Sequence, residues 1–360
     1  MQIKINPLDT LFFRDGKPFT MGEDSWTSGI FPPYPSVIYG ALRSAYFSNH
    51  VDELKKATKW NDPTKNLKIK GIHFLVEDAD DNVNIYSPLP NDCVQKKGDG
   101  DNVVSILQIH ELANVKSSCP TRYVLKSMIT EKVESVGGGL ISITSLKKYL
   151  ECTNDSFSSI LKVTDKVLAE PKIGIGISNK TGTAKKGMFY RVGMNRLDGL
   201  SLLIDFEGLD LPKEGMMKLG GEGKAACYKK PKKHISPSIY DSKVDGTMFK
   251  LYLSTPTIFR KGWLPVWIDE KTLIGKYKGL KLKLLTASIG KTISIGGFDM
   301  KARKPKPMRK AVPAGSLYYF KIVEGDLRKA FEVFNQTAIS DIDPMQGFGI
   351  AYVGGVHSNA

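Results

Sequence analysis

The chain has 360 residues, a hydrophobic content of 41% and a formal net charge of +15 at pH 7. This content is enough for a large core, divided over about two domains. No apolar segment of about 18 residues occurs, and the first residues alternate like a strand rather than a signal peptide, which excludes a membrane-spanning protein. We therefore expect a soluble cytoplasmic protein that binds no membrane.

The charge is concentrated in the second half of the chain. Residues 1–180 carry 22 basic and 21 acidic side chains, whereas residues 181–360 carry 30 and 16. Between residues 213 and 310 there are 23 basic and seven acidic residues. Such a region produces a positive field that attracts a polyanion, so a nucleic acid is the expected partner.

The sequence predicts no metal site and no cofactor. Its four cysteines lie far apart without a Cys-x-x-Cys pair, which indicates neither a zinc site nor a disulfide framework. Gly174 and Gly176 begin a dinucleotide fingerprint, but Asn179 stands where the third glycine is needed. We also expect no nucleoside triphosphatase, because a strand rather than a helix follows the Gly290-Lys291-Thr292 segment.

The first half begins with an alternating segment, residues 1–7, which predicts a strand. A proline-rich stretch at 31–35 then precedes an apolar segment at 37–46 that favours a helix. Ser36 is predicted as its N-cap, and the first-turn N–H groups of such a helix can bind phosphate. Arg43 lies two turns further on the same face. An ordinary capped core helix is the alternative interpretation.

Further along, residues 68–76 and 83–86 predict a hairpin with an acidic turn. Residues 91–171 form an insertion that the pattern does not place, and we expect a partner-facing or mobile appendage. Strands are predicted at 171–178 and 188–194, joined by a glycine-rich connection.

A second glycine-rich segment contains Gly220, Gly221 and Lys224. Two adjacent glycines allow backbone N–H groups to approach a phosphate closely, and the lysine supplies positive charge. The alternative is a tight turn between a helix and a strand.

The second half alternates strand patterns with one amphipathic helix. Strands are predicted at 250–255, 280–285, 291–295 and 317–323, a helix at 326–335, and a last strand at 347–354. The last segment echoes an RRM signature, in which Phe348 would stack on a base.

These elements predict an α+β protein of two ferredoxin-like (RRM-like) domains with antiparallel sheets, glycine-rich loops and inserted loops. We place the first domain at 1–212, with the insertion at about 91–171. The second domain, 213–360, carries a basic loop at 296–315.

The basic loop is the strongest candidate for a phosphate-binding element. Its cations repel one another and Pro305 and Pro307 keep the chain extended, so neither a helix nor a ladder is expected here. A solvated surface loop is the alternative. The predicted RNA-binding residues of the whole chain are Ser36, Arg43, Gly220, Gly221, Lys224, Gly296, Gly297, Phe298, Lys301, Arg303, Lys304, Lys306, Arg309 and Lys310.

Several of these motifs occur in an order that resembles a known family. They are residues 7–19, 31–36, 40–43, 181–184, 219–223, 296–298 and 313–316. Together they resemble the third subunit of the type III-B CRISPR Cmr complex, a member of the RAMP superfamily, over nearly the whole chain.

The resemblance implies an antiviral defence protein that binds the 5′ tag of the crRNA and joins the large palm-domain subunit to the backbone RAMP subunit. It implies no catalytic activity for this subunit. By similarity, Ser36, Arg43 and the glycine loops lie near RNA.

Two other functions stay open from the sequence. The chain could be a metal-independent endoribonuclease that processes crRNA, in which case His110 or His73 would act as general acid or base. It could also be an assembly adaptor whose basic surface meets an acidic subunit.

Overall fold

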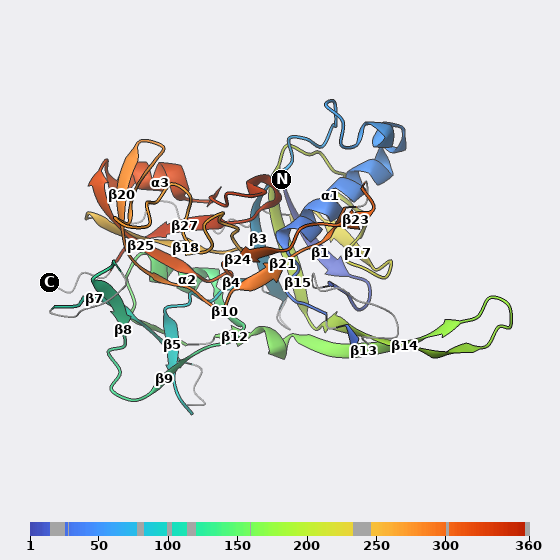
Figure 1. Ribbon diagram of the computed structural model, residues 1–360, viewed down its shortest axis with the longest axis horizontal. Helices are drawn as coiled ribbons and strands as arrows, with labels where there is room; N and C mark the ends of the chain where they lie inside the picture. Colours follow the sequence, from blue (N-terminus) through green and yellow to red (C-terminus); the bar gives the residue numbers. More distant parts are fainter. Residues whose placement is uncertain are drawn as a thin grey trace.

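The computed structural model describes residues 1–14, 26–27, 29–77, 83–98, 103–113, 120–158, 160–232, 246–299 and 302–356. It has the predicted α+β class: two large antiparallel sheets lie beside each other, and helices pack on them (Figure 1). Lys301, one of the predicted RNA-binding residues, and residues 15–19 of the family motif lie outside the described residues.

The first sheet contains eight of the described strands. In spatial order they are β12 (Leu161–Lys162), β10 (Gly139–Ser142), β4 (Val83–Pro88), β3 (Lys68–Glu77), β15 (Leu200–Glu207), β1 (Gln2–Pro7), β17 (Ala225–Lys229) and β16 (Glu214–Lys218). The predicted first strand and the predicted hairpin of β3 and β4 are confirmed. Helix α1 (Pro35–Asn49) buries Ile38, Leu42 and Ala45 against this half of the molecule, because these residues recur at helical spacing.

The connections in the first sheet follow a split β-α-β arrangement. Helix α1 joins β1 to β3, yet β15 lies between these two strands, and β17 pairs with the other side of β1. This order is the one that a ferredoxin-like unit requires. Its second helix is replaced here, because residues 208–224 contain β16 and a turn. The ferredoxin-like assignment therefore stays a prediction that the strand order supports.

The second sheet contains six described strands. In spatial order they are β19 (Ile274–Tyr277), β20 (Leu280–Ser288), β25 (Leu317–Glu324), β18 (Met248–Leu253), β27 (Ile350–Gly354) and β26 (Thr337–Ala338). Strands β18, β20, β25 and β27 repeat the order of the first sheet. Here the second helix is kept: α3 (Leu327–Phe334) joins β25 to β27, and the Asp326 side chain caps it by accepting a hydrogen bond from the Lys329 N–H.

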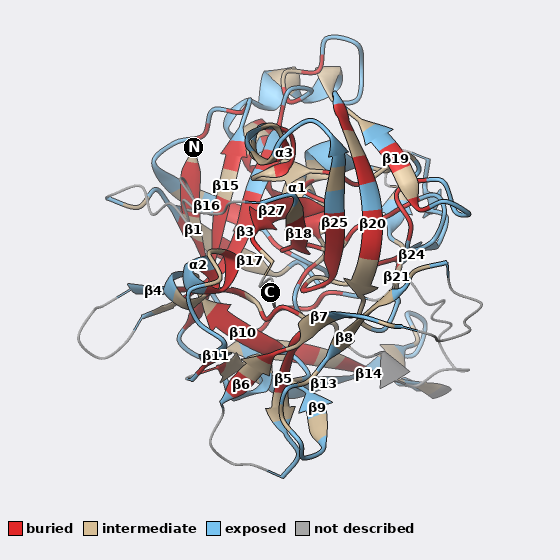
Figure 2. Cartoon of the chain, turned by 90° about the vertical axis from the view of Figure 1, so that its left-hand side faces the viewer, coloured by how far each residue is buried: buried red, intermediate tan, exposed pale blue. Residues whose placement is uncertain are grey.

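The second sheet has a core cluster of its own, with Phe249, Leu282 and Phe320, and a larger core is shared by the two halves. It contains Ile5 and Leu202 from the first sheet together with Leu317, Tyr319 and Tyr352 from the second. Figure 2 shows the buried segments continuing from β1 and β15 to β25 and β20. Because β16 and β17 complete the first sheet, the change of sheet falls between residues 229 and 248 rather than at residue 212.

The described part of the predicted insertion belongs to this core and is not an appendage. Its strands β10 and β12 extend the first sheet, and helix α2 (Ile143–Leu150) buries Leu146, Tyr149 and Leu150. A smaller sheet completes it, with the strand order β11 (Ser156–Phe157), β6 (Val104–Ile106), β5 (Cys93–Lys96) and β9 (Val133–Ser135). Strands β7 (Gln108–Glu111) and β8 (Tyr123–Lys126) form a separate hairpin.

A buried carboxylate fastens this insertion to the second sheet. Asp92, which is fully buried, accepts hydrogen bonds from the hydroxyls of Tyr149 at 2.6 Å and Tyr319 at 2.5 Å. The Lys250 ammonium lies 3.5 Å from the centre of the Tyr149 ring. These contacts join α2, β25 and β18, so the halves are held in one fixed arrangement.

A long hairpin leaves the body of the molecule (Figure 1). It pairs β13 (Val167–Ile177) with β14 (Ala184–Leu197), and β2 (Trp26–Thr27) lies parallel to β14. Ile173, Ile175 and Ile177 are exposed on one face of it. Three 3₁₀ helices are described in addition: η1 (Val51–Lys56), η2 (Val163–Asp165) and η3 (Pro344–Gln346). Among the described residues, no helix is long and apolar enough to cross a membrane.

Candidate nucleic-acid interface

The basic loop folds into two short ladders, which we call the basic hairpin (residues 293–311). Strand β21 (Ile293–Ile295) pairs with β24 (Arg309–Ala311), and β22 (Phe298–Asp299) pairs with β23 (Lys304–Pro305). The prediction that no ladder forms here was wrong. Ile293 and Ile295, two positions apart on β21, pack against the body of the molecule where the basic hairpin begins. Every residue from 302 to 310 is exposed.

The turn of the basic hairpin is closed by polar contacts within it. The Asp299 carboxylate accepts a hydrogen bond from the Ala302 N–H at 2.9 Å, and the Lys306 N–H donates to the Gly297 carbonyl at 2.9 Å. Arg303 takes the left-handed backbone conformation, with φ of 50°. Gly296 and Gly297 connect β21 to β22, and Phe298 is 53% exposed on β22.

The side chains of this hairpin form a group of exposed cations. Its members are Arg303, Lys304, Lys306, Arg309 and Lys310. None of them forms an ion pair with a carboxylate of the described chain, although the Lys310 ammonium donates to the Ser294 hydroxyl at 3.1 Å. Exposed cations without an internal counter-charge are available to phosphate groups.

Helix α1 begins beside the base of this hairpin. The N-cap is Tyr34 and Pro35 is the first helical residue, so the prediction that Ser36 caps the helix was wrong. Proline suits this first position because it has no N–H group to leave unsatisfied. The Tyr34 hydroxyl donates to the Ser294 carbonyl at 3.0 Å, which ties the start of α1 to β21. Ser36 lies in the first turn, half-buried, and its contact with RNA stays a prediction.

A cavity of about 360 Å³ opens next to this junction. Its lining comes from both sheets and from the insertion, and includes Tyr34, Phe74, Gly139, Thr255, Ile293 and Ala314. The cavity thus lies where the start of α1, the base of the basic hairpin and the segment 313–316 meet. This volume is within the range of pockets that hold small molecules.

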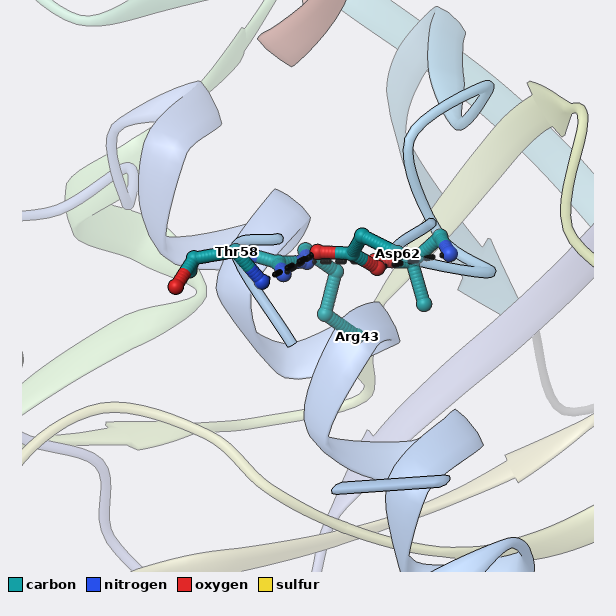
Figure 3. Close-up of polar contacts among 4 residues, drawn as sticks. Arg43, Thr58 and Asp62 are labelled. Atoms are coloured by element: carbon teal, nitrogen blue, oxygen red, sulfur yellow. Dashed lines mark hydrogen bonds and ion pairs between the residues drawn. The ribbon is translucent and has the colours of Figure 1, made fainter. Parts of the chain in front are cut away.

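Arg43 has internal partners (Figure 3). Its guanidinium donates to the Asp62 carboxylate at 2.6 Å and to the Thr64 hydroxyl at 2.7 Å. Burial raises the pKa of Asp62, but hydrogen bonds from Thr64 and Thr58 and the Arg43 charge outweigh it and leave this pKa below its usual value. The charge of Arg43 is therefore neutralised within the fold. Sequence reasoning missed Asp62 and Thr64, which lie about twenty positions away.

The turn with Gly220 and Gly221 packs against the start of the chain. It connects β16 to β17, so it joins two strands and not a helix and a strand. The Gly221 N–H donates to the Phe12 carbonyl at 2.8 Å, and a side chain on Gly220 would meet the same oxygen at 2.4 Å. This N–H group is therefore not free to bind phosphate.

Lys224 also has a carboxylate beside it. Its ammonium lies 2.7 Å from the Asp9 carboxylate, and this hydrogen bond lowers the pKa of Asp9. Asp9 belongs to the strand-flanking segment that the family resemblance includes, but the pairing could not be read from the sequence.

The histidines of the endoribonuclease alternative lie in different surroundings. His73 is fully buried, where its Nδ1 lies 3.0 Å from the Ser87 hydroxyl, and burial lowers its pKa to about 4. A side chain in this position cannot contact a scissile phosphate. His110 is exposed on β7. Phe348, in the segment that echoes an RRM signature, is 1% exposed, so its ring is not available for stacking on a base. No cluster of potential metal ligands occurs among the described residues.

The structure therefore brings together only part of the predicted site. Ser36, Gly296, Gly297 and the exposed cations gather around the junction of α1 with the basic hairpin. Arg43, two turns further along α1, is held by Asp62, and the Gly220 turn lies against Phe12 and Asp9.

Comparison with solved structures finds chains of type III CRISPR complexes. Two cryo-EM structures of the type III-B Cmr-β complex bound to cognate target RNA, one also with AMPPnP, contain a chain 16% identical to this one. The TM-scores are 0.49 and 0.48, with 89% and 93% of this chain and 86% and 93% of the other chain covered. A crystal structure of the Csm3–Csm4 subcomplex of type III-A gives 11% identity and a TM-score of 0.39, with 99% of each chain covered.

The sequence comparisons are more specific than these structural ones. None of the curated proteins matches the sequence significantly. The family model described as "CRISPR-associated protein (Cas_Cmr3)" matches residues 3–355. Since this match spans nearly the whole chain, the chain belongs to the CRISPR-associated Cas_Cmr3 family.

Proposed function

We propose that this chain is a non-catalytic RNA-binding subunit of a type III-B effector complex. It holds the 5′ tag of the crRNA and links the large palm-domain subunit to the backbone RAMP subunit. The observation that carries this proposal is the group of exposed cations on the basic hairpin, which have no carboxylate partner within the described chain and lie on a hairpin fixed to the start of α1.

The arrangement supports binding of a single strand. Lys304 and Lys306 stand two positions apart, on β23 and directly after it, so their side chains can meet neighbouring phosphates, and Arg303 lies in the turn before them. Phosphate contacts position a strand, whereas base contacts specify its sequence. Phe298, exposed on the same hairpin, offers an aromatic ring for stacking.

The adjacent cavity supports recognition of a short tag. Its lining combines aromatic rings with small residues such as Gly139 and Ala314, and backbone groups can approach a ligand closely there. A nucleotide of the strand held by the basic hairpin would lie at its opening.

The proposal is tested by titrating the purified chain with single-stranded tag RNA at two salt concentrations. A variant in which Arg303, Lys304, Lys306 and Arg309 are replaced by alanine should bind about ten- to a hundredfold more weakly. Its salt slope should fall by about 2 to 3, because four fewer phosphates release their counterions.

A matched control removes the same charge at the other end of the second sheet. Lys271, Lys276, Lys278 and Arg328 are all exposed there, and their replacement by alanine should keep most of the affinity and the salt slope. Equal losses in the two variants would contradict the proposal. Incubation with precursor repeat RNA in chelator should leave the RNA intact; a defined cut that is lost in His110→Ala would favour the endoribonuclease instead.

A further inference from the structure

The most exposed aromatic side chain among the described residues lies on a loop that is not part of the proposed RNA interface. Trp60 is 87% exposed, in the segment 57–65 that we call the Trp60 loop. It follows η1, on which Val51 and Leu54 are 68% and 55% exposed. Residues three apart eclipse each other in a 3₁₀ helix, so these two aliphatic side chains share one face. Three large apolar side chains thus face solvent within ten residues.

The Trp60 loop is held in one conformation by the buried Asp62 carboxylate (Figure 3). One oxygen accepts the Thr58 N–H at 2.6 Å and the Arg43 guanidinium at 2.6 Å. The other accepts the N–H of Thr64 at 2.8 Å and its hydroxyl at 2.6 Å. Thr58 keeps the left-handed backbone, with φ of 63°. A loop backbone fixed in this way loses little conformational entropy when Trp60 binds a partner.

The charge around Trp60 is weakly positive and differs from that of the basic hairpin. Residues 51–65 carry four basic and three acidic side chains, whereas residues 293–311 carry six and one. One of the four, Lys56, is paired with Glu53 at 2.8 Å. Lys55, Lys59 and Lys65 are exposed, and the Lys65 ammonium donates to the Trp60 carbonyl at 3.4 Å.

This composition fits a protein rather than a nucleic acid. A net charge of one attracts a polyanion weakly, and exposed aliphatic side chains such as Val51 and Leu54 have no partner on an RNA strand. Tryptophan surrounded by residues that exclude water is typical of the centre of a protein interface. Cations at the rim are complementary to carboxylates of a partner.

We propose that the Trp60 loop is a docking site for another protein, whose surface offers an apolar pocket rimmed by carboxylates. Trp60 fills the pocket, Val51 and Leu54 cover its edge, and Lys59 and Lys65 meet the carboxylates. Arg43 and Asp62 act as positioning residues that hold the loop. The site is separate from the proposed RNA interface, and it rests on the proposed function only in placing the partner among subunits of the effector complex.

The partner is identified by crosslinking in the assembled complex. The photoreactive residue p-benzoylphenylalanine replaces Trp60, and the full chain is assembled with the other purified subunits and crRNA. We expect a covalent adduct with one protein subunit. The same residue at Met128, which is 66% exposed on the insertion, controls for exposure alone and should not give that adduct. An adduct with RNA, or none, overturns the proposal.

Affinity measurements test the chemistry of the interface. With the crosslinked subunit as titrant, Trp60→Ala should weaken binding at least about tenfold. Lys59→Glu with Lys65→Glu should weaken it about threefold or more, with a reduced dependence on salt. Unchanged affinity in Trp60→Ala overturns the proposal. Both variants should keep the melting temperature and the affinity for tag RNA, so a failure here is distinct from a failure of the RNA-binding proposal.

Discussion

Two regions of this chain use the same kind of side chain for different purposes. Near α1, the Arg43 guanidinium lies 2.6 Å from a buried carboxylate, and near β17 the Lys224 ammonium lies 2.7 Å from Asp9. On the basic hairpin, consecutive cations are exposed and meet no carboxylate of the described chain. In the sequence these cations looked alike, because each of them was a basic residue close to glycines or to the start of a predicted helix.

The difference lies in the distance to the nearest carboxylate. A cation with a carboxylate at hydrogen-bond distance contributes to the fold, and a phosphate would first have to displace that partner. A cation whose neighbours are mostly other cations raises the local potential, and a phosphate strand relieves the repulsion. Substitutions at the partly buried Arg43–Asp62 pair should therefore change the stability of the protein, and those on the basic hairpin its affinity for RNA.

The largest effect on stability is expected at Asp62. Asp62→Ala removes four hydrogen bonds and leaves the Arg43 charge unpaired in a partly buried position, which should lower the free energy of unfolding by about 3 kcal/mol. Denaturant unfolding measures it. Asp52, exposed on η1, is the control, and Asp52→Ala should leave the denaturation midpoint unchanged. A midpoint for Asp62→Ala equal to that of Asp52→Ala would show that the network does not hold the fold.

The next effect is a dependence of stability on pH caused by His73. Its pKa is about 4 in the folded protein, below the ordinary value of 6.5, so the folded state keeps it neutral while the unfolded chain binds a proton. The unfolding free energy should therefore fall as the pH drops from about 6.5 to about 4, by up to about 3 kcal/mol.

A pair of histidine variants isolates this contribution. His73→Gln should flatten the pH dependence of unfolding between about pH 6.5 and 4, since only this buried ring is removed from the titration. His110→Gln, at an exposed position, should keep the slope of the unmodified protein. The same slope in both variants would mean that the pKa of His73 does not differ between the folded and the unfolded states.

The fold could be read from the sequence where a local pattern decides the structure. The alternation of Ile3 and Ile5 and the amphipathic pattern of residues 326–335 gave correct elements. The start of α1 was misplaced because Ser36 is a good N-cap in isolation, whereas Pro35 is the better first helical residue. The insertion was misjudged because Tyr149 and Asp92 find their partners only in the folded core.

The candidate site was less predictable for the same reason. The sequence shows that Arg43 and Lys224 are cations but not that Asp62 and Asp9 neutralise them. The ladders of the basic hairpin were missed because its cations obscure the pairing of Phe298 with Pro305. The sequence shows which residues are basic, but only the fold shows which carboxylate lies beside each of them.

The turn between β16 and β17 contains Gly220 and Gly223, whose surroundings differ. At Gly220, φ is 85° and an added side chain would meet the Phe12 carbonyl at 2.4 Å, so Gly220→Ala should destabilise the protein by about 2 kcal/mol. At Gly223, φ is 66° and nothing lies within 4 Å, so Gly223→Ala should lose about 1 kcal/mol. Denaturant midpoints measure the difference, and a larger loss at Gly223 would show that the contact with Phe12 is not made.

The smallest effect on stability and on RNA affinity is expected at Lys224. Substitutions here separate the ion pair within the fold from phosphate binding. Its ion pair with Asp9 is on the surface, so Lys224→Ala should leave the melting temperature nearly unchanged. The sequence predicted an RNA contact here, but the paired ammonium would have to leave Asp9 to reach a phosphate. We therefore expect Lys224→Ala to keep the RNA affinity within about twofold, while Asp9→Ala, which frees the lysine, should strengthen binding at low salt. A loss of affinity in Lys224→Ala as large as that of a single substitution on the basic hairpin would make the Gly220 turn part of the RNA interface.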